Sequence, residues 1–280
     1  MSRPDDAPRM PPGACAGTRA HAPGVGASSG AGATAPADVA APNAQLHADG
    51  VADEVQAVRD RYARRVPQDA RYSLRNPAAM LAWQERLRAT ADLFGQVGLP
   101  DLAGLRLIEI GCGTGGNLLD AMRLGFAPEH IAGAELLADR YAVARSVLPA
   151  DVQLWQGDAT ATDFGAASWD IVWQSTVFSS LLDDAFQQQL ADTMWRCVRP
   201  GGGVLWHDFT VDNPRNRDVR GVPLARVRAL FPQASRLVTL RITLAPPIAR
   251  AVTRVHPLLY PLLNTLPPLR THVLAWLAKP

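Results

Sequence analysis

A cluster of glycines follows an apolar run in "LRLIEIGCGTGGNLLDAM", residues 105–122. Gly111, Gly113 and Gly116 have G-x-G-x-x-G spacing, and Gly111, Gly113 and Gly115 have G-x-G-x-G spacing. Both spacings occur in loops that bind adenosine-containing cofactors, because a residue without Cβ lets the backbone approach a ligand closely. By themselves the glycines indicate either such a loop or a tight turn between a strand and a helix.

Two acids stand at the ends of the following apolar runs. Glu135 closes the second run, 24 residues after Gly111, where a carboxylate can accept hydrogen bonds from both hydroxyls of a ribose. Asp158, in "QGDAT" after the third run, can accept one from an adenine amino group, and it can equally cap the following turn. These positions suit a nicotinamide dinucleotide and S-adenosylmethionine alike.

Apolar runs alternate with helical patterns along the centre of the chain. Strands are expected at 105–110, 131–135, 152–155, 169–174 and 203–208. Helices are expected at 116–124, 138–147, 184–198 and 223–231. Two further strand patterns, 236–244 and 271–280, can pair antiparallel at a sheet edge. The alternation predicts an α/β fold with a doubly wound, mainly parallel, seven-stranded Rossmann-like sheet and an antiparallel last strand.

The domain boundaries follow from composition. Residues 1–50 contain 14 Ala, seven Gly and seven Pro and no aromatic residue, which predicts a disordered tail. Residues 51–280 are expected to form one domain. Within it, two amphipathic patterns in 51–100 predict a helical cap, and residues 245–270 form an insertion between the last two strand patterns.

Cysteine usage and hydropathy indicate the cellular compartment in which the protein is expected. The three cysteines have no disulfide or metal-ligand spacing, so neither a metal site nor an oxidising compartment is predicted. The apolar stretch 255–269 contains four prolines and is too short to cross a bilayer. We therefore expect a cytoplasmic protein, with peripheral membrane contact through 245–270 as an open alternative.

The order of several motifs resembles the class I S-adenosylmethionine-dependent methyltransferases over residues 57–280. These motifs are E-I-G-C-G-T-G, the acid ending the second strand, G-D-A, S-W-D-I-V, and R-P-G-G before a strand. The final antiparallel pair is also similar to that family and absent from dehydrogenases. The resemblance favours S-adenosylmethionine as cofactor over the alternative of an NAD-binding oxidoreductase.

The resemblance implies nine cofactor-binding residues: Glu109, Gly111, Gly113, Gly115, Glu135, Leu136, Asp158, Ala159 and Gln174. In such enzymes the glycines pass close to the methionine part and the ribose, braced by Glu109. In the same enzymes the residue at the position of Glu135 binds the ribose hydroxyls, and the residue at the position of Leu136 packs on the adenine. The adenine edge falls to Asp158 and Ala159, and Gln174 lies beneath the cofactor.

Methyl transfer is an in-line displacement, so the protein mainly orients the acceptor and excludes water. A base is useful only when the acceptor must lose a proton. His207, at the carboxyl end of the fifth strand, is a candidate base, or a hydrogen-bonded residue below the pocket. Asp208 is a candidate polar group facing the acceptor or the sulfonium. Alternation along a strand points the two side chains to opposite faces, which argues against a dyad.

The acceptor is less defined. Segments such as "DIVWQSTVFSSLLDD" and "RTHVLAWLAKP" resemble a bacterial methyltransferase subgroup associated with polysaccharide or glycolipid biosynthesis, in which Tyr often stands where this chain has His207. This suggests O- or N-methylation of a small-molecule, glycan or lipid-linked acceptor. The W-Q-S-T after the fourth strand differs from the [DN]-P-P-[YF] of nucleic-acid enzymes, so no nucleic acid is expected. A non-catalytic, cofactor-binding subunit stays open.

Charge and loop composition point to two further segments. Residues 212–280 carry ten Arg and one Lys against two Asp, a net charge of +9 in a chain of net charge +2. Within them, Arg215, Arg217 and Arg220 suit an anionic acceptor, or pair with neighbouring Asp side chains. The insertion 245–270 is a candidate acceptor roof, membrane contact, dimer face or packed element. The loop 71–77 is either a lid or a helix boundary.

Overall fold

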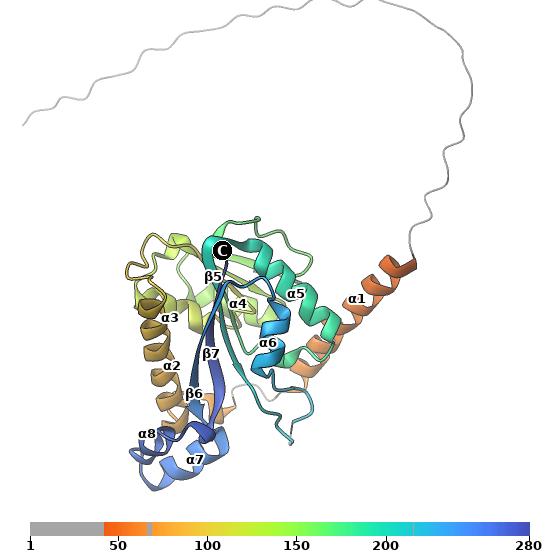
Figure 1. Cartoon of the computed structure of the whole chain (residues 1–280). Helices are drawn as coiled ribbons and strands as arrows, with labels where there is room; N and C mark the ends of the chain where they lie inside the picture. The colour runs from red at the N-terminus through yellow and green to blue at the C-terminus, as the bar shows by residue number, and fades with distance from the viewer. Residues whose placement is uncertain (1–41, 66–68, 215) are drawn as a thin grey trace, which may run out of the picture. The chain divides into compact units, whose positions relative to one another are not determined.

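Seven strands form one sheet in the order β3-β2-β1-β4-β5-β7-β6 in this computed structural model, which describes residues 42–65, 69–214 and 216–280 (Figure 1). The strands are β1 (Leu107–Ile110), β2 (Ile131–Glu135), β3 (Gln153–Gln156), β4 (Trp169–Ser175), β5 (Val198–Phe209), β6 (Arg236–Leu244) and β7 (Arg270–Ala278). Strands β1 to β5 pair in parallel, and β7 pairs antiparallel with both β5 and β6. The predicted fold class and antiparallel last strand are confirmed.

Helices alternate with the strands as the sequence pattern predicts. They are α1 (Pro42–Ala63), α2 (Pro77–Gln96), α3 (Gly116–Leu124), α4 (Ala138–Val147), α5 (Asp184–Cys197), α6 (Leu224–Leu230), α7 (Pro246–Val255) and α8 (Leu259–Asn264). Short 3-10 helices are η1 (Ala70–Tyr72), η2 (Pro128–His130), η3 (Phe178–Ser180) and η4 (Pro267–Leu269). In the described part of the chain, every helix is too short or too polar to span a membrane.

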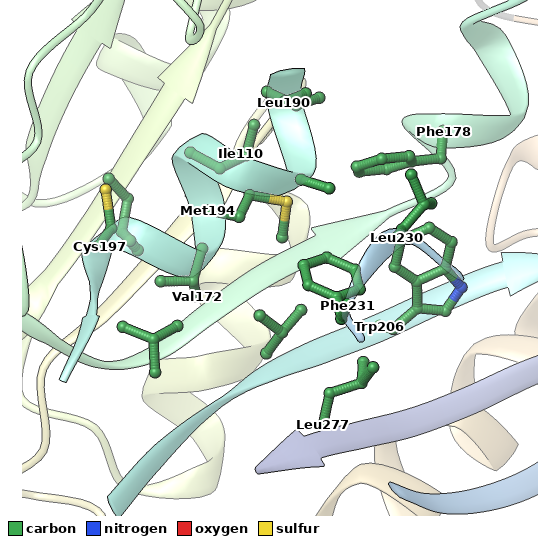
Figure 2. Packing of buried hydrophobic residues seen from close by; sticks show 14 of the residues in the cluster. Ile110, Val172, Phe178, Leu190, Met194, Cys197, Trp206, Leu230, Phe231 and Leu277 are labelled. Carbon is green, nitrogen blue, oxygen red and sulfur yellow. The ribbon is translucent and has the colours of Figure 1, made fainter. Parts of the chain in front are cut away.

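Helices cover both faces of the sheet, and successive strand residues point to opposite faces, so side chains on both faces are buried. Leu107 belongs to the apolar cluster that includes residues of α2, α3 and α4, whereas its neighbour Ile108 belongs to the cluster that includes residues of α1, α5 and α6. Figure 1 shows α2 and α3 on one side of the sheet and α5 and α6 on the other. On the α5 side Trp206 stacks near Phe178, with ring centroids 4.6 Å apart, and also contacts Phe231 (Figure 2).

The N-terminal boundaries differ from those predicted. Helix α1 begins at Pro42, with proline at the first helical position, so residues 42–50 of the predicted tail are helical. The rest of that tail, 1–41, lies outside the described residues. The predicted cap 51–100 is divided, because α1 packs with α5 and α2 packs on the opposite face. Composition identified the helical segments, whereas tertiary packing decided which face each one covers.

The insertion 245–270 folds as α7, α8 and η4. A single carboxylate, that of Glu85, anchors it to α2. Glu85 of α2 accepts hydrogen bonds from the Thr243 backbone N–H at 3.0 Å, the Tyr260 hydroxyl at 2.7 Å and Asn264 Nδ2 at 2.6 Å. Apolar contacts between α2, α7 and α8 surround this carboxylate. Thr243 itself has a positive φ of 68°, a conformation that a non-glycine residue holds only where its surroundings enforce it.

We expect Glu85→Ala to lower the free energy of unfolding by about 2–3 kcal/mol, because it leaves three donors without their acceptor. Urea denaturation followed by circular dichroism measures the change. The matched control is Asp92→Ala, which removes an exposed acid from the same helix. Equal stability of the two variants would show that Glu85 does not anchor the insertion.

Candidate functional site

The glycine loop turns β1 into α3 through three residues in the left-handed region. Gly111, Gly113 and Gly115 have φ values of 71°, 57° and 86°. A Cβ on Gly111 would lie 2.5 Å from Val177 Cγ2, so the turn after β4 also requires glycine there. The Gly111 N–H donates to the Ala134 carbonyl at 2.8 Å, which binds the loop to the end of β2.

Glu135 joins two loops at the carboxyl edge of the sheet. Its carboxylate accepts the Gly113 N–H at 2.7 Å and the Leu137 N–H at 2.8 Å. The side chain is buried, and burial raises its pKa, opposed by these two hydrogen bonds and by Arg140. One acid therefore fixes the spacing between the loop after β1 and the loop after β2.

A pocket of about 800 Å³, open to solvent, lies where β1, β2 and β4 end. It brings together five of the nine residues that the resemblance implies: Gly111, Glu135, Leu136, Asp158 and Ala159. Its position is the edge at which doubly wound sheets bind their ligands.

Two other implied residues support the pocket from beneath. Glu109 points to the α2 and α3 side, where it is buried and accepts a hydrogen bond from Asn117 Nδ2 at 2.6 Å. Burial raises its pKa to about 8. Gln174 is fully buried, accepts the Val177 N–H at 3.1 Å and donates to the His207 carbonyl at 3.4 Å. Gln174 therefore braces the loop after β4, which lines the pocket, whereas Glu109 holds the first turn of α3.

Asp158 combines the two roles that the sequence left open. It lines the pocket, and it also caps the following turn by accepting the Thr160 N–H at 2.8 Å and the Thr160 hydroxyl at 2.9 Å. A carboxylate offers about four lone-pair directions. The cap therefore leaves acceptor capacity for a ligand.

Helix α1 forms one wall of the pocket, a role that the sequence did not indicate. Val55, Val58 and Tyr62 line it, and the Arg140 guanidinium lies 4.6 Å from the Tyr62 ring centroid. The amphipathic pattern of 52–66 predicted the helix, but no local signal says which surface its apolar face covers.

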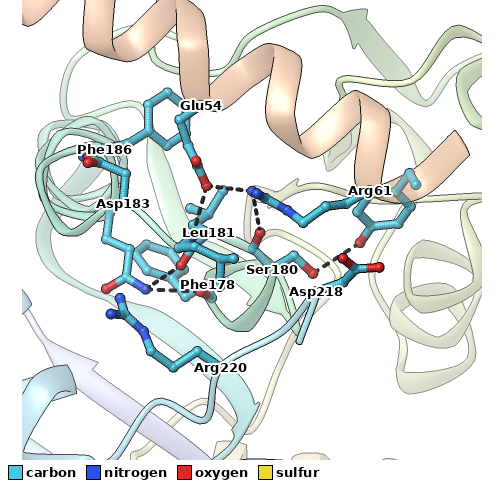
Figure 3. A network of polar contacts seen from close by, with 12 residues as sticks. Glu54, Arg61, Phe178, Ser180, Leu181, Asp183, Phe186, Asp218 and Arg220 are labelled. Atoms are coloured by element: carbon cyan, nitrogen blue, oxygen red, sulfur yellow. Dashed lines mark hydrogen bonds and ion pairs between the residues drawn. The ribbon is translucent and has the colours of Figure 1, made fainter. Parts of the chain in front are cut away.

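A buried polar network holds α1 in this place (Figure 3). Arg61 donates to Glu54 Oε1 at 2.6 Å and to the Ser180 carbonyl at 3.1 Å. The same oxygen of Glu54 accepts the Leu182 N–H at 2.8 Å. Ser180 and Leu182 belong to the segment after β4. The network therefore links α1, which forms one wall of the pocket, to that segment.

His207 is buried behind Ser175, at the carboxyl end of β5. Its Nδ1 is 3.0 Å from the hydroxyl of Ser175, which lines the pocket, and its ring stacks on His272 at 5.3 Å. Nε2 has no hydrogen-bond partner among the described residues. Burial, then His272 and Arg86, hold the pKa of His207 well below its usual range, so the imidazole is neutral at pH 7.

Asp208 points to the opposite face, as strand alternation predicts. It is fully buried and does not line the pocket described above. Its carboxylate accepts the Ser179 N–H at 3.1 Å and the Phe209 N–H at 2.9 Å. Burial raises its pKa to about 7. In the structure Asp208 therefore braces η3 through the Ser179 backbone, and its role towards an acceptor stays a prediction.

The other predicted loops contribute no residue to the lining of the pocket. Arg220 forms an ion pair with Asp184 of α5, not with the neighbouring aspartates of its own loop. Arg217 is exposed, and Arg215 lies outside the described residues. In the loop 71–77, Asn76 caps α2 by accepting the Ala78 N–H, and Tyr72 is exposed. The helix-boundary interpretation of that loop matches the structure.

Comparison with known proteins identifies the central segment. Residues 107–202, from β1 into β5, match a family model described as a methyltransferase domain. No curated protein matches the chain.

Several solved methyltransferase structures are similar to the chain. An S-adenosylmethionine-dependent methyltransferase from Mesorhizobium loti is 16% identical, with a TM-score of 0.48 over 68% of this chain and 99% of its own. Phosphoethanolamine N-methyltransferase 2 from Haemonchus contortus is 16% identical, with a TM-score of 0.52 over 80% of this chain and 61% of its own. CalS10, an amino pentose methyltransferase from Micromonospora echinaspora, is 29% identical, with a TM-score of 0.37 over 43% of this chain and 48% of its own.

The fold and the matched domain agree on the class of protein. The Haemonchus structure shares the Rossmann-like fold, and the matched segment contains the glycine loop, Glu135 and Asp158. The chain thus contains a methyltransferase domain at residues 107–202, on the Rossmann-like fold that the Haemonchus structure also has.

We expect Glu135→Ala to weaken S-adenosylhomocysteine binding by about 2–3 kcal/mol, because it removes an acceptor from two loop amides and from the ribose. Isothermal calorimetry measures the loss. Asp139→Ala, at an exposed acid in the first turn of α4, is the control. Unchanged affinity of a folded Glu135→Ala protein would mean that the cofactor does not contact the end of β2.

A second expectation concerns pH. Burial, then Arg86, lower the pKa of His272 from 6.5 to about 4, below its value in the unfolded chain. The unfolded chain therefore binds the proton more tightly, and this contribution to stability is complete above pH 6.5 and lost as pH falls towards 4. Between pH 7 and pH 4.5, His272→Gln should lose about 2 kcal/mol less unfolding free energy than the wild type.

Urea titrations at several pH values test this difference. His256→Gln, which removes an exposed imidazole, is the control. If the unfolding free energies of the wild type and His272→Gln changed equally with pH, folding would not lower the pKa of His272.

Proposed function

We propose that the protein transfers the methyl group of S-adenosylmethionine to a hydroxyl or amino group of a small-molecule, glycan or glycolipid acceptor. The observation that carries the proposal is the position of Ser175. It lines the cofactor pocket at the end of β4 and is hydrogen-bonded to the buried His207 of β5. Beside the residues assigned to the cofactor, the pocket therefore contains Ser175, whose hydrogen-bond partner His207 can accept a proton.

The residues around the pocket fit the cofactor. Gly111 lines the pocket, and its backbone packs so closely against Val177 that a Cβ there would lie 2.5 Å from Val177 Cγ2. The Glu135 carboxylate spends only two of about four lone-pair directions on backbone amides, which leaves acceptors for the ribose hydroxyls. Leu136 offers an apolar surface to the adenine, and Ala159 lies beside Asp158 at its edge. We assign these contacts to the bound cofactor.

When bound, S-adenosylmethionine supplies the methyl group: the acceptor's lone pair forms the new bond to carbon as the carbon–sulfur bond breaks and its electron pair goes to sulfur. The Ser175 hydroxyl takes the proton that the acceptor loses and passes its own proton to His207 Nδ1, which leaves the serine neutral and the imidazole protonated. Burial lowers the pKa of His207, so the imidazole is neutral before the reaction and Nδ1 can accept the Ser175 hydrogen bond. General-base assistance of this kind contributes about 10²–10⁴-fold.

The class of acceptor rests on the sequence resemblance to the polysaccharide- and glycolipid-associated subgroup. Arg217 is the exposed cation among the described members of the predicted arginine set, since Arg220 is paired with Asp184. An anionic group on the acceptor would meet Arg217 near the end of β5. His207 stands at the position where Tyr is frequent in that subgroup, and we assign it the proton-accepting role.

The test supplies the acceptor from the cell itself. The full-length protein is incubated with trideuteromethyl-labelled S-adenosylmethionine and with aqueous or lipid extracts of cells lacking the gene. Mass spectrometry should find one labelled product, and Glu135→Ala should abolish its formation. With that product's precursor as substrate, Ser175→Ala and His207→Gln should lower kcat by about 100-fold while S-adenosylhomocysteine affinity stays unchanged.

Two results would contradict the proposal. Cofactor binding without a labelled product in any fraction would indicate a non-catalytic, cofactor-binding subunit. A labelled product made at the wild-type rate by both Ser175→Ala and His207→Gln would remove the Ser175–His207 pair from the mechanism. In that case kcat of the wild type should also show no pH dependence that the variants lack.

A further inference from the structure

The insertion 245–270 presents an apolar surface to solvent. Val255, Leu258, Leu262 and Leu266, hereafter the insertion surface, are 78%, 69%, 62% and 50% exposed. They make up four of the nine large exposed hydrophobic residues in the described chain, within a segment of 26 residues. Such clustering on a soluble surface marks an interaction site.

The inward side chains of the same segment already pack on the domain. Ala249 and Tyr260 pack against α2 and β6, and Thr253 and Asn264 are buried beside them. Together with the Glu85 hydrogen bonds, these contacts fix α7 and α8 on the domain. The exposed aliphatic groups therefore have no core left to fill, and they stand on a rigid support.

Positive charge surrounds these groups. The insertion contains Arg250, Arg254 and Arg270 and no acidic residue. Arg254 is exposed on α7, next to Val255. Arg250 lies close enough to Asp69 to help lower its pKa, after the larger effect of Arg71. Arg270 donates to the Asn264 and Arg241 carbonyls, so its charge stays beside the insertion.

The insertion surface lies at the edge where the methyl group is transferred. Strand β6 runs in the same direction as β4 and β5, because β7 is antiparallel to both β5 and β6. The insertion follows the carboxyl end of β6 and precedes β7, whose His272 pairs with Phe209 at the carboxyl end of β5. In Figure 1, α7 and α8 lie beyond this end of the sheet.

We propose that the insertion surface binds an anionic lipid membrane and brings the acceptor site to lipid-linked substrates; this rests on the proposed function. Aliphatic side chains next to arginines are the composition of an interfacial membrane contact. A second copy of the chain fits less well. Two-fold pairing would place Arg254 and its equivalents against each other with no acid in the segment to oppose them.

The experiment uses the full-length protein in vesicle sedimentation. The vesicles contain either neutral phosphatidylcholine alone or phosphatidylcholine with phosphatidylglycerol. Anionic vesicles should retain the wild type at low salt, and near-physiological salt should release much of it, because screening then acts beyond about 8 Å. Val255→Ser/Leu258→Ser/Leu262→Ser should lower the partition coefficient by at least about tenfold, and Arg250→Gln/Arg254→Gln should remove the preference for anionic vesicles.

A matched control separates this surface from exposed apolar residues in general. Val143→Ser/Val147→Ser removes two exposed valines, 45% and 48% accessible, from α4. Wild-type retention by this control and loss by the insertion variant supports the proposal. Retention by the insertion variant, or no retention of the wild type on any vesicle, overturns it. So does a wild-type dimer in analytical ultracentrifugation that the insertion variant converts to a monomer.

The readout is independent of catalysis. Calorimetry with S-adenosylhomocysteine reports the cofactor site, and the labelled-product assay reports turnover. Vesicle binding without turnover would therefore contradict the proposed function alone, whereas turnover of water-soluble acceptors without vesicle binding would contradict the membrane proposal alone.

Discussion

The site depends on the two hydrogen bonds that the Glu135 carboxylate accepts from backbone amides. Parallel strands bring their carboxyl ends to one edge, but the loops that leave those ends need a fixed separation before they can hold a ligand. By accepting one amide from each loop, Glu135 sets that separation. The positive φ at Gly113 turns its N–H towards this acid, so the glycine and the carboxylate constrain each other. Cofactor binding then uses an arrangement that folding has already made.

The wall formed by α1 adds a second constraint of the same kind. Its buried Arg61–Glu54 pair is also hydrogen-bonded to backbone groups after β4, so removing either partner would leave a buried charge, which is costly. One turn further, Arg64 pairs with Asp218 in the loop after β5. Helix α1 thus contacts both the cofactor wall and the loop next to the acceptor side. A displacement of α1 would change both at once.

Sequence patterns predicted the elements better than their contacts. Helices α3 and α4 and strand β6 have the predicted bounds, because their apolar periodicity and flanking glycine or turn residues are local signals. Glu135 was identifiable since it ends a strand at a fixed distance from the glycines. The Ser175–His207 pair was not, because it depends on the register of β4 against β5. The placement of α1 was equally hidden, since the helix can cover either face of the sheet.

The antiparallel β7 explains why so much function gathers at one edge. A parallel last strand would need a crossover from the carboxyl edge to the opposite one, and an insertion in that crossover would be spread along a face. Because β7 starts at the edge where β6 ends, residues 245–270 must stay there. Any surface built on that segment therefore lies on the acceptor side. The topology can add a substrate- or membrane-directed element without disturbing the loops that Glu135 holds.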